Sequence, residues 1–176
     1  MDVAAMIKSA IGSILDRDLN ALRREVEAYT DEAELWRTVP GIANSGGTLV
    51  LHLAGNLQHY FGAHLGRTPY VRNRAAEFAR RDVPRAELLR EIEAARAAVK
   101  AGLADLSAAQ LTGEYPETIA GARLTTGEYL VHLTTHFAYH LGQVDYHRRA
   151  VTGSQTTVGA MRPGDLGSAR SAPVEA

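Results

Sequence analysis

The sequence predicts an all-α protein built as a four-helix bundle. Apolar residues recur at intervals of three and four in four long segments, 2–29, 46–65, 84–106 and 125–150. No segment has a convincing strand pattern, and Ala, Leu and Arg, which favour helices, dominate a chain that is 45% hydrophobic. Short accessory helices and a weakly structured C-terminal tail are expected to complete the fold.

The composition narrows the possible functions. The 176 residues carry a formal net charge of −1, which gives no electrostatic reason to expect nucleic acid or an anionic membrane as a partner. No apolar run is long enough to span a bilayer, and the N-terminal residues lack the profile of a signal peptide. We therefore expect a cytoplasmic protein. Cysteine is absent, so any thiol chemistry must use a thiol supplied by a substrate or cofactor.

The first predicted helix, residues 2–29, is amphipathic. We interpret the charged residues between its apolar positions as a solvated face; they are Asp16, Arg17, Asp18, Arg23, Arg24, Glu25 and Glu27. A short capped turn is expected at 30–36. Trp36, the single tryptophan, is predicted to fill the core beneath the following loop.

The second predicted helix, 46–65, contains a group of polar residues among its leucines. His52, Asn56 and His59 are spaced by four and three, so they share one helical face. A histidine among leucines is usually a hydrogen-bonded structural residue. We interpret His59 and His64 in that way, and treat His52 as a candidate metal ligand.

Between the second and last helices the pattern is less regular. A short helix is possible at 74–79, and Pro84 is placed as a first-turn proline of the third long helix. A capping box is expected at 107–110, followed by an irregular loop at 111–124. We divide the chain into a bundle, residues 1–152, and a tail, residues 153–176, which is rich in Thr, Gly, Ser and Pro.

The last predicted helix carries the strongest chemical signal. Thr125 and Glu128 have the spacing of a capping box, and two arginines and Gly153 mark the other end. His132, His136 and His140 step round the helix by only about 40° each, so they form one stripe. Imidazoles four residues apart can bind one metal ion.

Spacing leaves two choices for the ligand pair, His132 with His136 or His136 with His140. A third ligand must come from another helix, and His52 is the best-placed candidate. The pair does not form the zinc-protease motif, because Phe137 stands where a general-base Glu would be. The sequence also lacks a nucleophile elbow, a phosphate-binding loop and a nucleotide-binding glycine pattern.

Two of these helices together resemble motifs of the DinB-like superfamily. Residues 44–57, NSGGTLVLHLAGNL, look like the metal-bearing helix of that superfamily, and residues 136–143, HFAYHLGQ, look like its second motif. Residues 74–78, RAAEF, are also similar to the linker of one DinB-related subfamily. The resemblance covers roughly residues 1–150.

The resemblance implies an up-down-down-up four-helix bundle, often dimeric, with three ligands on one divalent metal ion. By position those ligands are His52, His136 and His140, which leaves His132 as a neighbour. Gln143 would be a structural residue or would hydrogen-bond a metal-bound imidazole. The extra imidazoles at His132 and His147 could compete for the ion.

Asn56, His59 and His132 are candidate pocket residues around this metal. Zn²⁺ or Ni²⁺ is the expected ion. Characterised superfamily members are thiol-dependent, namely a mycothiol-dependent isomerase and bacillithiol or glutathione S-transferases. The resemblance thus implies thiol-dependent S-transferase or isomerase chemistry on a small molecule, with a low-molecular-weight thiol as the second reactant, in a homodimer. The alternatives are a hydrolase that uses a metal-bound water, a non-catalytic, metal-stabilised, stress-linked binding protein, and a bundle without metal.

Overall fold

The computed structural model describes residues 2–171, and its regular structure is entirely helical. The four long helices are α1 (Val3–Glu27), α2 (Gly46–Leu57), α4 (Arg85–Ala104) and α6 (Thr126–Thr152). The shorter elements are α3 (Arg74–Ala79), α5 (Ala108–Thr112) and the turns η1 (Glu32–Leu35), η2 (Gln58–Ala63) and η3 (Pro163–Asp165).

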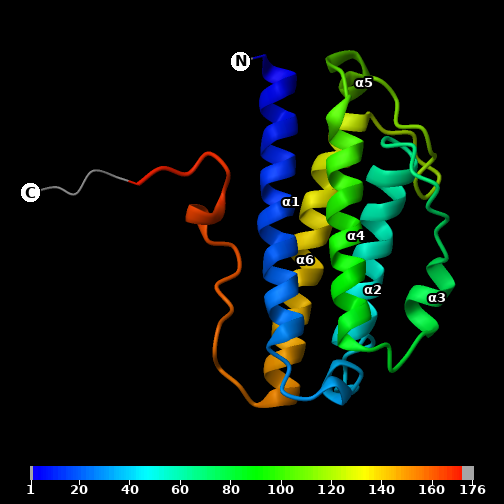
Figure 1. Ribbon diagram of the computed structural model, residues 1–176. Helices are drawn as coiled ribbons and strands as arrows, with labels where there is room; N and C mark the ends of the chain where they lie inside the picture. Colours follow the sequence, from blue (N-terminus) through cyan, green and yellow to red (C-terminus); the bar gives the residue numbers. More distant parts are fainter. Residues whose placement is uncertain (1, 172–176) are drawn as a thin grey trace, which may run out of the picture.

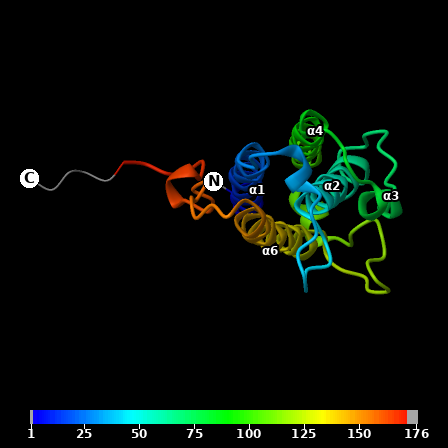
Figure 2. The same ribbon diagram turned by 90° about the horizontal axis from the view of Figure 1, so that it is seen from below.

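The long helices pack as the predicted up-down-down-up bundle. In Figure 1, α1 and α6 run in one direction, whereas α2 and α4 run in the other. The crossover from α2 to α4 carries α3, which lies on the outer side of α2 in both views (Figures 1 and 2). The all-α class and the bundle are confirmed. Among residues 2–171, no helix combines the length and apolarity that a membrane crossing needs.

The helix ends follow the predicted caps in part. Thr125 caps α6 by accepting a hydrogen bond from the backbone N–H of Glu128, but within the described residues the Glu128 side chain makes no return bond to the Thr125 N–H, so the predicted capping box is only half formed. Gly153 ends the helix with φ +71°. The capping box at Ser107 forms as expected. Pro84 is the residue before α4 rather than its first helical residue. The predicted second helix does not stay α-helical to Leu65, because its backbone widens into a π-turn at η2.

This π-turn packs closely against α4. Two glycines make the approach possible: a Cβ at Gly62 would lie 3.0 Å from the Ala98 Cβ, and a Cβ at Gly102 would lie 2.5 Å from the Phe61 carbonyl oxygen. The backbone hydrogen bond from His64 to His59 spans five residues, as in a π-helix. The change of register therefore occurs where α2 and α4 are tightly packed.

The core contains Trp36, as predicted, and also charges that the sequence had placed on the surface. Arg17, Asp18 and Glu25 are buried, so the solvated-face interpretation is wrong for these three. Arg17 pairs with Asp18 (Nε to Oδ1, 2.7 Å), and Arg148 of α6 pairs with Glu25. Because each charge has a partner, the bundle can bury it.

The tail covers part of this same face of α1. Residues 153–171 form only the single turn η3, yet they run back along α1, as Figure 1 shows. Arg24 donates to the Val158 carbonyl (2.9 Å), and the Gly167 N–H donates to Ser13 Oγ (2.7 Å). Residues 172–176 of the predicted tail lie outside the described residues.

Candidate metal centre

Three histidines from two distant segments meet between α2 and α6. His52 lies in the middle of α2, and His136 and His140 lie one turn apart on the facing side of α6. One ring nitrogen from each lies within 4.8 Å of the other two. The Nε2 atoms of His52 and His136 are 3.4 Å apart, close to the about 3.3 Å that separates two ligands of a tetrahedral ion bound at about 2.0 Å.

Glu77 fixes the orientation of His52 by contacting Nδ1, the ring nitrogen that does not face His136. Its Oε2 lies 3.0 Å from His52 Nδ1, and Arg72 binds both of its carboxylate oxygens at 2.7 and 2.9 Å. Burial alone would raise the pKa of Glu77, but the hydrogen bonds from His52 and Arg72 outweigh burial and hold that pKa below its usual value. The carboxylate therefore stays charged and accepts a hydrogen bond from His52 Nδ1–H.

A glycine on α2 makes room for this carboxylate. A Cβ at Gly55 would lie 2.4 Å from Glu77 Oε1, so a larger residue would displace this carboxylate from its present position. Asn73 caps α3 by accepting a hydrogen bond from the Ala76 N–H (3.0 Å). The crossover is thus shaped to bring one acidic side chain to the back of His52.

Gln143 plays the corresponding part for His140. Its Oε1 lies 2.6 Å from His140 Nδ1, and because an amide oxygen only accepts, the Nδ1 must carry the proton. The same reasoning places the proton of His52 on Nδ1, next to Glu77. In both rings the Nε2 lone pair is then free, as a metal ligand requires.

His136 differs from the other two because its Nδ1 is buried without a hydrogen-bond partner among residues 2–171. Burial, followed by the charges of His140 and His52, lowers the pKa of His136 to about 4. Burial also lowers the pKa of His140. At neutral pH both rings are uncharged, so their lone pairs are available without the loss of a proton.

The donor set therefore fits a divalent transition-metal ion. Three imidazoles converge, and two of them are oriented by Glu77 and Gln143. Three protein ligands with an open position are typical of catalytic zinc sites, whereas structural zinc sites usually have four. Such a site could bind and activate a thiol or a water molecule.

The remaining predicted pocket residues are spread around this centre. His132 is exposed, and its ring lies 6.1 Å from that of His136 and stacks on Tyr129 at 5.9 Å. Asn56 is buried one turn beyond His52. His59 is turned toward a different group of residues near the end of α2, formed by His64 and Glu117.

His147 is not a competitor for the ion. It is 1% exposed and sits two turns beyond His140 on α6. Its Nδ1 lies 2.7 Å from the Tyr29 hydroxyl, and its Nε2 lies 2.8 Å from the carbonyl oxygen of Arg37. With both nitrogens bonded, His147 is a structural residue, which corrects the suggestion that it might relocate the ion.

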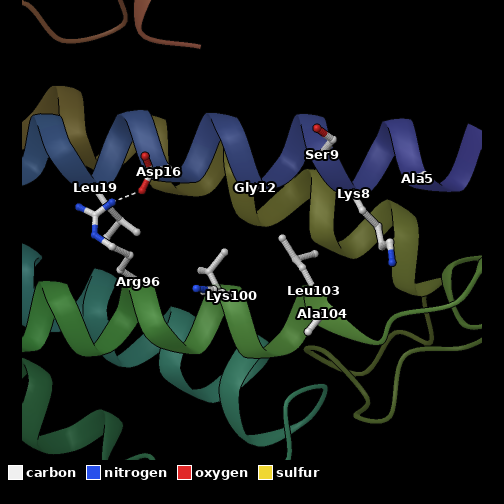
Figure 3. A pocket seen from close by; sticks show the side chains of 11 residues that line it. Ala5, Lys8, Ser9, Gly12, Asp16, Leu19, Arg96, Lys100, Leu103 and Ala104 are labelled. Atoms are coloured by element: carbon white, nitrogen blue, oxygen red, sulfur yellow. Dashed lines mark hydrogen bonds and ion pairs between the residues drawn. The ribbon is translucent and has the colours of Figure 1, made fainter. Parts of the chain in front are cut away.

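The hollows on the surface do not all belong to this centre. A space of about 600 Å³ lies between α1 and α4, where Gly12 faces Leu103 and none of the three histidines takes part (Figure 3). A smaller hollow of about 370 Å³ lies beside Gln143, against the loop that precedes α2. None of the three histidines lines this second hollow, but Gln143 does, and Gln143 contacts His140. A further hollow of about 140 Å³ is lined by Glu77, which contacts His52.

The roles of Glu77 and Arg72 had no counterpart in the sequence analysis. The sequence indicates a short helix at 74–79 and a resemblance of residues 74–78 to a subfamily linker, but neither assigns a role to Glu77. The one available signal was Asn73, a good N-cap residue directly before a short helix that carries a lone acid. Nothing in that pattern says that the helix folds back onto His52.

Comparison with known proteins gives one match. A family model described as mycothiol S-transferase matches residues 10–153. That family belongs to the DinB-like superfamily, so the resemblance based on the two helix motifs is confirmed. No curated protein and no solved structure matches the chain.

Proposed function

Because this chain belongs to the mycothiol S-transferase family, we propose that it is a metal-dependent transferase that joins a small thiol to an electrophilic small molecule. The observation that carries the proposal is the convergence of His52, His136 and His140 on one point with oriented lone pairs. Zn²⁺ and Ni²⁺ are the expected ions, since imidazole suits both.

The chemistry supplied by such an ion is the lowering of the pKa of a bound thiol, so that it reacts as a thiolate at neutral pH. The protein residues hold the donors in place. Glu77 keeps the proton of His52 on Nδ1, and Arg72 keeps Glu77 charged. In the reaction a sulfur–carbon bond forms and the leaving group departs with its electron pair, while the thiol proton passes to solvent.

The hollow beside Gln143 is the proposed substrate space. It holds about 370 Å³, within the range of small-molecule sites. Ile42 and Tyr146, both exposed, supply an apolar and an aromatic surface at its edge.

The test is a thiol-conjugation assay on tag-free protein stripped with a chelator and reloaded with Zn²⁺ or Ni²⁺. Mycothiol is the first thiol, glutathione and bacillithiol are compared with it, and monochlorobimane is the electrophile. We expect the His136→Asn variant to lose the activity by about 100-fold or more, because the open site needs all three ligands.

His132→Asn is the matched control, since it removes an imidazole one turn earlier on the same helix. It should keep both the metal and the activity. Equal metal content and equal rates in wild type and His136→Asn would overturn the proposal. Metal binding without conjugation of any thiol, together with a large loss of stability on stripping, would favour the non-catalytic alternative.

The homodimer implied by the resemblance and the cytoplasmic location expected from the sequence stay predictions. Light scattering during gel filtration measures the mass in solution directly. A mass of one chain, 19.0 kDa, would contradict the dimer.

A further inference from the structure

A second group of metal-binding side chains lies near the end of α2, away from the three-histidine centre. His59 Nε2 and His64 Nε2 each lie 2.9 Å from Glu117 Oε2, and the two nitrogens are 3.3 Å apart. The three side chains are 21%, 25% and 38% exposed, so the group is accessible from solvent. His59 is seven residues beyond His52, about 10 Å along the helix.

The π-turn is what brings the two histidines together. In an α-helix, residues five apart point about 140° away from each other. In η2 the backbone bond runs from the His64 N–H to the His59 carbonyl oxygen, so the two residues lie one above the other and their ring centroids are 4.6 Å apart. Single π-turns inside α-helices occur frequently at functional sites.

The loop between α5 and α6 supplies Glu117. Tyr115 anchors this loop to the same turn, because its hydroxyl donates to the Tyr60 carbonyl oxygen at 2.7 Å. Bridges between Glu114 and Thr125 and between Ile119 and Ala122 hold the loop in a compact shape. The carboxylate therefore reaches the histidines from a loop that is fixed on both sides.

We propose that His59, His64 and Glu117 form a second site for a divalent transition-metal ion. Two imidazoles and one carboxylate are a known ligand set for zinc. A point equidistant from the three donor atoms lies about 1.8 Å from each in their plane, or about 1 Å above the plane at zinc–ligand distances of about 2.0–2.2 Å. The donors are thus spaced for one ion with an open side.

Without metal, Glu117 Oε2 hydrogen-bonds His59 Nε2 and also lies 2.9 Å from His64 Nε2, which is itself hydrogen-bonded to His59 Nε2. An ion would replace the protons shared among these three atoms, and burial already lowers the pKa of His59, which keeps that ring neutral. The nearest cation, Arg72, stacks over Tyr60 at 5.4 Å and is neutralised by Glu77. Because the site joins the helix to the loop, bound metal should also stabilise the loop.

The test counts Zn²⁺ bound per chain after dialysis of tag-free protein against buffered free Zn²⁺. We expect two ions in wild type and one in Glu117→Gln, because an amide keeps the size of the side chain but is a poor zinc ligand. His64→Gln should also bind one. Glu114→Gln, which changes an exposed acid in the same loop, should keep two.

His136→Asn separates this inference from the proposed function. If only the second site binds, wild type and His136→Asn each hold one ion and Glu117→Gln holds none. That result would support the second site and contradict the three-histidine centre. Equal zinc counts in wild type, Glu117→Gln and His64→Gln would overturn the second site.

Hydrogen exchange gives an independent readout. Amides at 114–124 should exchange more slowly when Zn²⁺ is added to wild type, and the protection should disappear in Glu117→Gln and persist in Glu114→Gln. If Glu117→Gln loses helical circular dichroism, His64→Gln decides the question. Zinc-induced protection that is the same in wild type and His64→Gln would again contradict the site.

Discussion

Both halves of α6 carry histidines, but the ring nitrogens of these histidines have different partners. In the first half, His136 and His140 point their Nε2 atoms at a shared space with His52, and the Nδ1 of His136 has no partner within residues 2–171. In the second half, His147 and Arg148 are each 1% exposed, and both are hydrogen-bonded to neighbouring elements.

The comparison shows that burial alone does not identify a functional histidine. His147 and His136 differ in the partners of their ring nitrogens. When both nitrogens are bonded within the fold, the residue stabilises the bundle; when a nitrogen faces other lone pairs, the residue is free to bind a ligand. Substitutions in the second half should therefore reduce stability, and those in the first half should reduce metal binding.

The largest effect is expected for Arg148→Ala. It leaves Glu25, which is fully buried, without its cation, and it removes bonds to Asp145 and to the Thr156 carbonyl. Breaking a buried ion pair on one side costs about 3–5 kcal/mol. Urea unfolding of wild type and variant measures this difference in the free energy of unfolding.

Arg149→Ala is the control for that measurement. Arg149 also pairs with Asp145, but it is one-third exposed, so its loss should change the free energy of unfolding by no more than about 1 kcal/mol. If the free energy of unfolding falls by similar amounts in the two variants, burial of the Arg148–Glu25 pair does not increase its contribution to stability.

The next effect is expected for Glu77→Gln, behind the metal centre. The amide can still bond to His52, but it loses the charge that holds the Nδ1 proton and the ion pair with Arg72. Loss of such a partner of a metal-binding histidine lowers metal affinity by about 10–100-fold. Competition with a chromophoric chelator measures the zinc affinity.

Glu87→Gln provides the comparison for Glu77→Gln, since it removes an acid that pairs with Arg80 in the same region but not with a histidine. Its zinc affinity should equal that of wild type. If Glu77→Gln also binds zinc as tightly as wild type, the carboxylate does not orient His52 in the bound state.

Much of this organisation follows from periodic patterns in the sequence. The four long helices could be predicted from the periodic recurrence of their apolar residues, although α2 is buried on every face. The spacing of His136 and His140 lies within a single helix. Spacing leaves open whether His132 or His140 pairs with His136, and the family resemblance settles that choice. His52 is the best-placed ligand from another helix before the resemblance is considered, although spacing within one helix carries no information about its partner helix.

Features that depend on contacts between distant segments were beyond the sequence patterns. The burial of Glu25 requires Arg148, which is 123 residues away. The placement of Glu77 depends on a crossover that folds back onto Gly55, and the π-turn at η2 depends on close packing against Gly102 of α4. A periodic pattern indicates which face of a helix is buried. It does not indicate which polar group of a distant segment contacts that face.

A pH effect of intermediate size is expected at His147. Burial lowers the pKa of this ring below its value in the unfolded chain, about 6.5. Below that pH the unfolded chain binds a proton at His147, whereas the folded chain does not. The stability contributed by neutral His147 is therefore present above about pH 6.5 and is lost as the pH falls.

His147→Gln removes this titration. The stability difference between wild type and variant should therefore be largest near pH 7.5 and should shrink toward pH 5.5, by at most about 1.4 kcal/mol per pH unit. Denaturant unfolding across that range measures it. A difference that is constant with pH would show that His147 titrates alike in the folded and unfolded chains.

The smallest effect is expected for His132→Gln, although His132 belongs to the same stripe as the two ligands. Its ring is exposed and stacks on Tyr129, and its centroid lies 6.1 Å from that of His136. Exposed substitutions of this kind usually change stability by less than about 0.5 kcal/mol. Zinc affinity, measured by the same chelator competition, should stay within about twofold of wild type. A tenfold loss would mean that the ion sits between His132 and His136 rather than between His136 and His140, and the pairing with Gln143 would then have no role in binding it.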